Sequence, residues 1–400
     1  MIKNVVIVND FDYIQGGASK VAIQTANMLV EKNKNLNVYF FSAVHDADTS
    51  LDKRVINICT NQGEALMNIN KIGGFINGIY NFKSKTYLKK LLKTLNSKET
   101  IIHVHGWTKA LSSSIFDISF KLKFKVVVTL HDYFTACPNG GYFNYKQNEI
   151  CNLRPLSCKC IKCNCDSRNY FFKMYRIVRQ FVQNKIVRLN ARLTDVISIS
   201  DFSENVLKRT LGEQVNIHRV YNPIDLDLNV KHIDYRKNNY FLYVGRVSKE
   251  KGVDIFCKAV TEAKKNGIVV GDGSELQKLK VAFKNIKFVG WKTPNEVKQY
   301  MQKSKALIIP SRWYEGAPLT PLEALQYGIP IITSDCNASV DYINDTNGLK
   351  FKNEFELRKI LEKFNDNSFN PKLISIPRKY LSNYYQEIFK IYEEIIENES

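Results

Sequence analysis

Residues 306–332 of the chain read ALIIPSRWYEGAPLTPLEALQYGIPII, and this stretch indicates the fold more clearly than any other. The apolar run at its start predicts a strand. The Gly-Ala-Pro that begins at Gly316 predicts a turn, and a helix and a second short strand follow. A strand that leads through a turn into a helix is where open α/β sheets bind ligands. Backbone N–H groups at such a helix start can bind hydroxyls or phosphates.

Strands and helices alternate along the rest of the chain as well. Short apolar runs, such as VVIV at residues 5–8 and VVVTL at residues 126–130, are separated by helical stretches, which predicts βαβ units and parallel sheets. A length of 400 residues is long for one domain, and an Asn-Pro step at residues 222–223 breaks the chain near its middle. We therefore predict two doubly wound, Rossmann-like α/β domains, over residues 1–220 and 221–379, and a C-terminal helix within residues 380–400.

The quoted stretch carries two glutamates eight positions apart, Glu315 and Glu323. In a ligand site, Glu315 would bind a sugar ring and Glu323 the ribose hydroxyls of a nucleotide. Otherwise they are two solvated acids on an ordinary loop and helix. Together with the flanking Pro-Ser, Glu-Gly, Glu-Ala and Gly-x-Pro, the stretch resembles the Glu-x7-Glu signature of the family 4 glycosyltransferases, which are retaining enzymes of the GT-B fold.

The resemblance implies both a fold and an activity. In a GT-B fold, residues 1–220 would form the acceptor-side domain and residues 221–379 the nucleotide-sugar-binding domain. The two would face each other across a cleft, and the helix in residues 380–400 would cross back to the first domain. The activity would be transfer of a hexosyl residue from a UDP- or GDP-sugar to a glycan or lipid-linked saccharide in cell-surface polysaccharide assembly. The anomeric configuration would be retained, and no catalytic metal is expected.

A basic loop from Gly245 to Gly252 follows a predicted strand directly. Its Arg246 and Lys251 would converge on a diphosphate, the guanidinium as a fork and the ammonium as a point charge. Positive charge placed there stabilises the leaving phosphate in the transition state, so two side chains could do without an Asp-x-Asp metal motif. The Arg-x4-Lys-Gly pattern is similar to that of the family, although a basic loop is also common on a basic protein.

Gly16 and Gly17 follow the first predicted strand and open a helix. Glycine lets the backbone approach a phosphate closely, although such a pair can also be a plain turn. The resemblance implies that these glycines face the donor diphosphate from the first domain. It also implies that Gly271 lies beside the nucleoside, with the strand end at Trp291 near the base, although both can be structural positions.

The resemblance further assigns contacts with the donor sugar to backbone N–H groups that follow Glu315. Pro318, which has no N–H, stands where the family often has a donor. The contacts would then come from Gly316, Ala317 and Leu319. The identity of the donor sugar stays open for this reason.

His131 stands at the carboxyl end of the predicted strand over residues 126–130. A histidine there can exchange hydrogen bonds with a sugar hydroxyl, and the resemblance implies a histidine near the transferred sugar and the acceptor. His103 and His105, at the end of another strand, are competitors. A histidine on a buried strand is more often a satisfied core residue, but we favour His131 as the active-site histidine.

Six of the nine cysteines lie within residues 137–165. Cys160 and Cys163 have the spacing of a zinc knuckle, and Cys137 and Cys151 could complete a tetrahedral site. A cytoplasmic chain would keep these residues as thiols, which argues against disulfides. We expect a structural zinc that pins this loop without taking part in catalysis, since four thiolates leave no open position. An iron–sulfur cluster and unbound thiols are the alternatives.

The net charge of +19 suits anionic partners, such as nucleoside diphosphates, anionic lipids or nucleic acid, or else reflects lysines spread over a solvated surface. Residues 81–93 and 168–181 are basic and amphipathic, like helices that lie on membranes, although for 168–181 we favour core packing. No apolar run approaches the roughly 18 residues of a membrane span, and the N-terminus resembles a strand rather than a signal peptide. We expect a cytoplasmic protein, with peripheral contact to the inner face of an anionic membrane as a further possibility.

Three other interpretations stay open. A GT-B epimerase or sugar-phosphate synthase would keep the fold and change the reaction. A zinc-stabilised nucleic-acid-binding protein would account for the charge and the cysteines, but its basic residues should form one continuous stripe. Here the strongest motifs lie at strand ends in both halves, which favours an enzyme with a cleft and no nucleic-acid partner. An inactive scaffold would not need Glu315, Glu323, Arg246 and Lys251 together.

Overall fold

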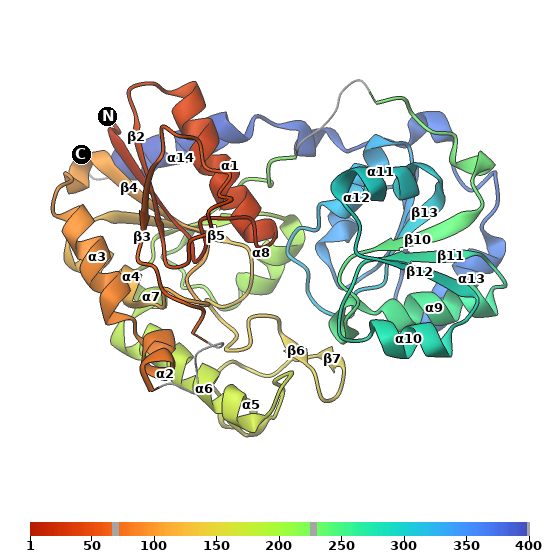
Figure 1. Cartoon of the computed structure of the whole chain (residues 1–400), viewed down its shortest axis with the longest axis horizontal. Helices are drawn as coiled ribbons and strands as arrows, with labels where there is room; N and C mark the ends of the chain where they lie inside the picture. The colour runs from red at the N-terminus through yellow and green to blue at the C-terminus, as the bar shows by residue number, and fades with distance from the viewer. Residues whose placement is uncertain (66–71, 225–229, 398–400) are drawn as a thin grey trace.

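The computed structural model describes residues 1–65, 72–224 and 230–397, which form two α/β domains side by side (Figure 1). The first domain is built on a seven-stranded parallel sheet. Its strands lie in the order β3 (Ile56–Cys59), β2 (Asn37–Ser42), β1 (Asn4–Val8), β4 (Thr100–Val104), β5 (Lys125–Leu130), β8 (Asp195–Ser198) and β9 (Asn216–Arg219). The parallel sheet predicted from the alternation of strands and helices is confirmed.

Helices cover both faces of this sheet, and the side-chain alternation of β1 shows how. Val5 and Ile7 pack into the same apolar cluster as residues of α1, whereas Val6 and Val8 pack with residues of α3 and α4. A strand buried on both faces is apolar at every position, which explains the VVIV run. The helices of this domain are α1 (Gly17–Lys32), α2 (Ile72–Ile79), α3 (Phe82–Leu92), α4 (Ser114–Lys121), α6 (Tyr170–Phe181), α7 (Leu189–Arg192) and α8 (Asp201–Leu207).

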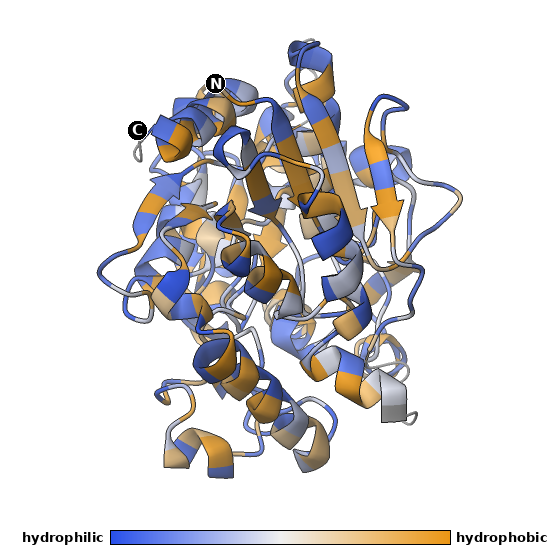
Figure 2. Ribbon diagram, turned by 90° about the vertical axis from the view of Figure 1, so that its left-hand side faces the viewer, coloured by the Kyte–Doolittle hydropathy of each residue, from blue (hydrophilic) through white to orange (hydrophobic). Residues whose placement is uncertain are grey.

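The hydropathy of the strands differs from that of the helices. In Figure 2, which faces the first domain, the strands are largely hydrophobic, and the helices around them carry hydrophobic and hydrophilic residues in turn. The edge strands β3 and β9 are exceptions because several of their residues are exposed. The sequence did not predict these two strands, since neither has a continuous apolar run.

An irregular arm leaves the first domain after β5 and returns at α6. It contains a short antiparallel hairpin, β6 (Phe143–Asn144) and β7 (Glu149–Ile150), followed by the five-residue helix α5 (Cys158–Lys162). In Figure 1 the hairpin extends below the sheet toward the second domain. The six clustered cysteines of residues 137–165 all belong to this arm.

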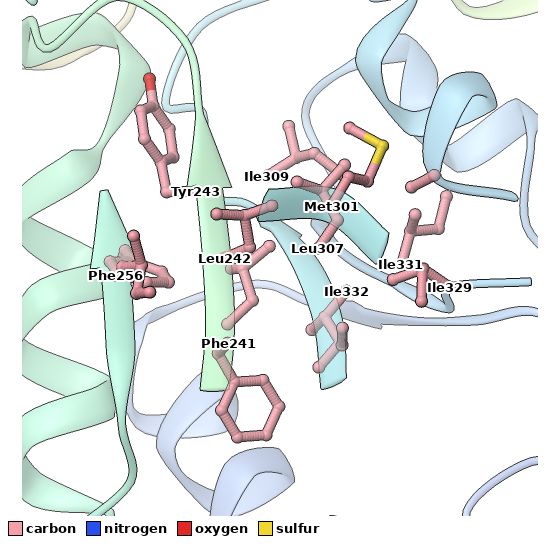
Figure 3. Packing of buried hydrophobic residues seen from close by; sticks show 14 of the residues in the cluster. Phe241, Leu242, Tyr243, Phe256, Met301, Leu307, Ile309, Ile329, Ile331 and Ile332 are labelled. Carbon is pink, nitrogen blue, oxygen red and sulfur yellow. The ribbon is translucent and has the colours of Figure 1, made fainter. Parts of the chain in front are cut away.

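The second domain is built on a six-stranded parallel sheet. Leu242, Leu307 and Ile332 from neighbouring strands meet in its core, with Phe256 and Met301 from the covering helices (Figure 3). The strands lie in the order β12 (Ile286–Gly290), β11 (Gly267–Val270), β10 (Tyr240–Val244), β13 (Ser304–Ile309), β14 (Ile331–Ser334) and β15 (Gly348–Phe351). The helices are α9 (Val253–Glu262), α10 (Leu276–Ala282), α11 (Pro294–Gln302), α12 (Thr320–Gln326) and α13 (Glu354–Lys363).

The C-terminal helix α14 (Tyr384–Glu397) leaves the second domain and packs on the first (Figure 1). Its Ile388 and Tyr392 are buried in the apolar cluster that contains β1 and α1. The Tyr384 hydroxyl lies 2.8 Å from the Thr25 hydroxyl of α1. The GT-B architecture implied by the resemblance, with a final helix that crosses back, is confirmed.

The two domains touch through the turn that follows β13 and through the segment that follows β14. The Ser200 hydroxyl, after β8, donates a hydrogen bond to the carbonyl of Gly316. The carboxylate of Asp341 accepts a hydrogen bond of 2.8 Å from the backbone N–H of Phe202. The bond from Ser200 holds the Glu315–Gly316 turn against the carboxyl end of β8.

Across residues 1–65, 72–224 and 230–397, no helix is long and apolar enough to cross a bilayer.

Candidate active site

Glu315 lies at the centre of the turn after β13, and its carboxylate has two firm partners. The Lys251 ammonium is 2.9 Å from one carboxylate oxygen, and the Ser311 hydroxyl donates a hydrogen bond to the other. Burial alone would raise the pKa of Glu315, but the Lys251 charge and the hydrogen bonds from Ser311 and Lys251 outweigh it. The pKa therefore lies below its ordinary value, and Glu315 is a carboxylate that accepts hydrogen bonds.

Arg246 stands at the start of the loop that ends with Lys251. One guanidinium nitrogen lies 3.0 Å from the carboxylate of Glu250, which is itself buried and accepts a hydrogen bond of 2.8 Å from Ser248. The Arg246 side chain is 60% exposed. Its guanidinium is thus tethered at one edge and still open to a ligand, as a phosphate-binding arginine must be.

Two glycines allow the loops of the second domain to approach one another. Gly252 has a φ of +65°, and a Cβ there would overlap the carbonyl oxygen of Pro310. Gly271 has a φ of +138°, and a Cβ there would overlap the carbonyl oxygen of Gly245. Gly271 therefore has a clear structural role, because it packs the loop after β11 directly on the loop that carries Arg246.

Backbone donors are available beside Glu315. Within the described part of the chain, the N–H groups of Gly316, Ala317 and Leu319 have no internal acceptor. Pro318 lies between them and contributes no N–H. Three N–H groups of one turn could therefore bind oxygen atoms of a ligand.

Gly16 and Gly17 lie at the start of α1 and are exposed. Gly16 has an extended backbone, and a Cβ at either position would meet no atom within 4 Å. Packing therefore does not explain these glycines. They leave the first turn of a 16-residue helix uncovered, which suits the close approach of an anion.

Glu323 lies on α12 and lines a cavity of about 570 Å³. Trp291 and Lys292, after β12, form another wall, together with Tyr327. Lys20 reaches the same cavity from α1 of the first domain. A pocket of this size, with an aromatic wall, a carboxylate and lysines from both domains, can hold a nucleoside.

His131 follows β5 and is half-buried, whereas His103 and His105 are buried. A Cβ on Gly316 would lie 3.3 Å from the carbonyl oxygen of His131, so the histidine adjoins the Glu315–Gly316 turn. Burial lowers the pKa of His131 to about 4. His131 is therefore neutral at physiological pH and can exchange hydrogen bonds without carrying charge.

The cysteines of the arm do not form a ready metal site. Among the described residues, no group of three or more histidine, cysteine, aspartate or glutamate side chains could hold a metal ion as it stands. Burial raises the pKa of the Cys137, Cys151 and Cys163 thiols. The zinc site assigned to Cys137, Cys151, Cys160 and Cys163 thus stays a prediction.

One unexpected residue accompanies these thiols. The ammonium of Lys173, on α6, lies 3.2 Å from the sulfur of Cys165 and 3.6 Å from that of Cys160. Lys173 is only 1% exposed. Lys173 thus brings a buried ammonium next to two thiols of the arm, and Cys165 belongs with the thiols to be tested for metal binding.

The motifs at the strand ends predict Glu315 and Arg246, but they do not predict the residues that contact these two side chains. Ser311 and Glu250 hold Glu315 and Arg246 in place, and Lys20 reaches the nucleoside-sized cavity across the domains. Ser311 could have been suspected, because it lies between the predicted strand and Glu315. Lys20 could not, since only the packing of the two domains brings α1 to α12.

Two family models match the chain. The model described as Glycosyltransferase Family 4 matches residues 15–228, which is more than half of the chain. The model described as Glycosyl transferases group 1 matches residues 227–383. Together they cover both domains.

Two proteins with similar sequences are named as galactosyltransferases. The chain is 32% identical to the lipopolysaccharide 1,6-galactosyltransferase of Salmonella typhimurium (strain LT2) over 149 residues, which are 34% of this chain and 41% of that protein. It is 26% identical to the UDP-Gal:alpha-D-GlcNAc-diphosphoundecaprenol alpha-1,3-galactosyltransferase of Escherichia coli over 209 residues, 46% of this chain and 51% of that protein. The aligned stretches thus span about half or less of these two relatives.

Solved structures match over nearly the whole chain. Anabaena Alr3699/HepE in complex with UDP and glucose has a TM-score of 0.63 at 16% identity, with 98% of this chain and 100% of that chain covered. The apo form of the lipopolysaccharide outer core galactosyltransferase WaaB has a TM-score of 0.61 at 19% identity, with the same coverage. At such identities the likeness shows the fold alone.

Proposed function

The chain belongs to glycosyltransferase family 4, and we propose that it transfers a hexosyl residue from a nucleoside diphosphate sugar to a glycan or lipid-linked saccharide, with retention at the anomeric carbon. The observation that carries this proposal is the ion pair of Lys251 and Glu315 at 2.9 Å. It lies where the turn of the second domain meets the strand ends of the first. Substrate atoms placed there would face groups from both domains.

The donor nucleotide would occupy the cavity beside Glu323. The carboxylate of Glu323 would accept hydrogen bonds from the ribose hydroxyls, and Trp291 would cover the base. The diphosphate would then reach Arg246 and Lys251, with the start of α1 at Gly16 on the opposite side. The relative named for transfer from UDP-Gal supports a uridine nucleotide, and a GDP-sugar is the alternative.

The transferred sugar would lie over the turn after β13. Glu315 is ionised, so it would accept hydrogen bonds from sugar hydroxyls rather than supply a proton. The N–H groups of Gly316, Ala317 and Leu319 would donate to ring substituents or to the phosphate. As the bond to the anomeric carbon breaks, the positive charges of Arg246 and Lys251 would stabilise the departing diphosphate.

Retention at the anomeric carbon would follow from attack on the face that the diphosphate leaves. The acceptor hydroxyl would approach from the side of His131, and the departing phosphate oxygen would take its proton. This route needs no carboxylate nucleophile, which fits a Glu315 already engaged with Lys251 and Ser311. Members of this family are retaining enzymes, and that membership supports the assignment.

The acceptor would belong to a cell-surface glycan under assembly. Two relatives are named for galactosyl transfer to lipopolysaccharide and to a diphosphoundecaprenol-linked sugar, and a third is named only as a protein in the cps region of Klebsiella pneumoniae. A lipid-linked acceptor would bring the first domain close to a membrane. The net charge of +19 is consistent with an anionic membrane surface.

An exposed apolar surface lies on α6, and it would be the contact with this membrane. Phe171, Val178 and Phe181 recur at the spacing of one helix face and are 59%, 42% and 52% exposed. The ring of Phe171 contacts Phe75 of α2, which extends the apolar surface to a second helix. The sequence favours core packing for residues 168–181. Tyr175 does so, but the aromatic face as a whole is not buried.

The other interpretations are weaker. The named relatives are glycosyltransferases, and neither family model describes an epimerase or a nucleic-acid-binding protein. A sucrose-phosphate synthase shares the fold at 16% identity, which says nothing about the reaction. We therefore do not favour an epimerase, a synthase or a nucleic-acid-binding role.

Thermal denaturation with UDP, GDP, ADP and CMP, at equal and saturating concentrations, tests the proposal. A ligand at 100 times its dissociation constant stabilises the native state by about 2.7 kcal/mol. We expect one nucleoside diphosphate, UDP or GDP, to raise the midpoint and CMP to leave it unchanged. If none of the four nucleotides shifts the midpoint, the donor site is wrong.

A further inference from the structure

Three histidines form a row in the first domain, and only the last one reaches the cleft. His103 and His105 lie at the end of β4 with ring centroids 4.1 Å apart, and His131, after β5, lies 5.2 Å from His105. His103 and His105 are 0% and 2% exposed. The row therefore runs from the buried core to the turn of Glu315 and Gly316.

The ring nitrogens of this row have different partners. Both ring nitrogens of His103 have hydrogen-bond partners. Nδ1 lies 2.6 Å from the Tyr392 hydroxyl, and Nε2 lies 2.6 Å from the Thr129 hydroxyl. Nδ1 of His105 lies 2.9 Å from Nε2 of His131. The other nitrogen of His105, Nε2, is buried, and among the described residues it has no hydrogen-bond partner.

All three imidazoles are neutral near pH 7. Burial lowers the pKa of His103 to about 3 and that of His131 to about 4, and it holds the pKa of His105 well below 6.5. Each neutral ring carries one N–H and one lone pair. A single proton must therefore lie between Nδ1 of His105 and Nε2 of His131.

The orphan nitrogen of His105 decides where that proton lies. If His131 carried it on Nε2, Nδ1 of His105 would be the acceptor, and the N–H of His105 would be on Nε2, buried without an acceptor. If His105 carries it on Nδ1, its Nε2 is only an unused lone pair. An orphaned buried N–H is costlier and rarer than an under-used acceptor, so the second arrangement is favoured.

We propose that His105 is a positioning residue that fixes His131 as the Nδ1–H tautomer, so that His131 offers a hydrogen-bond donor, and not a proton acceptor, to the ligand in the cleft. The ligand atom would be an oxygen of the donor sugar, the diphosphate or the acceptor, and to that extent the inference rests on the proposed function. His131 would then not act as a general base. The acceptor proton would have to leave by another route, as it does when the departing phosphate takes it.

Nitrogen NMR of the full-length chain with ¹⁵N-labelled histidine tests the tautomer without any substrate. His131→Gln identifies the His131 signals by their loss. We expect a protonated Nδ1 and an unprotonated Nε2 for His131 at pH 7.5. In His105→Leu the donor to Nε2 is gone, and His131 should shift toward the Nε2–H form. A wild-type His131 protonated on Nε2 would overturn the inference.

Kinetics separate positioning from a general structural effect. We expect His105→Leu to lower the release of UDP from a UDP-sugar roughly 10- to 100-fold, since misplaced catalytic groups cost rates of this size. His105→Asn, whose amide N–H can replace Nδ1–H, should keep most of the rate. In a chain that already carries His131→Asn, His105→Leu should add no further loss. Equal losses in both backgrounds would contradict the inference.

His218 offers a matched control, and the NMR measurement does not depend on the proposed function. His218, on edge strand β9, lies 2.9 Å from Asp195 and away from the row, so His218→Asn should change neither the His131 signals nor the rate. Should the wild-type chain turn over no nucleotide sugar, the proposed function would be wrong. The NMR result would still decide the tautomer of His131.

Discussion

Lys251 and Glu315 form an ion pair with 2.9 Å between Nζ and Oε2, although one lies on the loop after β10 and the other on the turn after β13. Both side chains are largely buried, at 22% and 10% exposure. The pair joins the loop that would bind the diphosphate to the turn that would bind the sugar. A ligand beside this pair would meet a cation and an anion in fixed positions.

Lys251→Met should leave the carboxylate of Glu315 buried without its cation. We expect the chain to lose about 1–3 kcal/mol of stability and transfer to fall by roughly 10²- to 10³-fold. Urea unfolding and donor turnover measure the two effects. Lys258→Met removes a lysine from a more exposed pair with Glu354, at 2.7 Å, and should change both quantities little.

The same variant has a distinct pH dependence. The folded pKa of Glu315 lies below its ordinary value of 4.5, so the pair stabilises the native state above about pH 4.5, and this contribution is lost as pH falls through the folded pKa. The stability difference between wild type and Lys251→Met should therefore shrink on acidification. A difference that stays constant from pH 7 to pH 3 would contradict the ion pair.

Arg246→Ala should abolish transfer and leave the fold intact, because the exposed guanidinium serves a ligand and no core. We expect an unchanged melting midpoint without nucleotide, and a loss of most of the stabilisation that the nucleoside diphosphate provides. Arg236→Ala is the matched control, since Arg236 is 45% exposed and pairs with Asp234 at 2.6 Å. A transfer rate equal to that of the wild type in Arg246→Ala would contradict the assignment of Arg246 to the diphosphate.

The buried histidines predict that the chain loses stability in weak acid. The pKa of His131 falls from 6.5 in the unfolded chain to about 4 in the native state, so the native state resists protonation. The stabilisation is present above about pH 6.5 and is lost as pH falls toward 4. For His131 alone the loss at pH 5 should be about 2 kcal/mol, measured by urea unfolding at pH 7 and pH 5. His131→Gln should reduce the difference by this amount.

The exposed aromatic face of α6 predicts binding to anionic membranes. Replacing Phe171 and Phe181 with aspartate should release the chain from phosphatidylglycerol vesicles in a flotation assay, because both apolar contact and charge attraction weaken. Phe355→Asp is the matched control, since Phe355 is 53% exposed on α13 of the other domain. Equal release by the control, or no binding by the wild type, would show that α6 is not the contact.

We predict that cysteines of the arm bind a zinc ion, which would bring their thiols closer together. We expect elemental analysis of protein purified under reducing conditions to find about one zinc per chain. Cys163→Ser and Cys160→Ser should lower the zinc content, and Lys173→Met should weaken zinc binding. Cys257→Ser, in the core of the second domain, should not change it. Stoichiometric iron, or no zinc in the wild type, would contradict the prediction.

The alternation of apolar runs and turns was enough to predict two parallel α/β domains. Runs such as that of β1 are apolar at every position because both faces of the strand are covered. The edge strands β3, β9 and β15 escaped prediction because exposed positions interrupt their pattern. Burial on both faces, not strand propensity, made the central strands visible in the sequence.

The sequence predicts individual residues of the candidate site but not the contacts between them. Glu315, Lys251 and Arg246 stood out through spacing and local motifs, but their pairing depends on the order of strands in the sheet. From the sequence alone, His105 is a competitor of His131 for the active-site position. The structure places it instead as the direct hydrogen-bond partner of His131, at 2.9 Å. Contacts of this kind arise from packing between strands, and no local sequence pattern specifies them.

Proton NMR of donor turnover would test the central claim most directly. The chain would be incubated in turn with UDP-galactose, UDP-glucose and GDP-mannose, all of which are α-linked. We predict release of the nucleoside diphosphate from one of them, with the first-formed sugar product in the α configuration, and a loss of this reaction in Lys251→Met. Release of a β product first, or no turnover of any donor, would contradict a retaining glycosyltransferase.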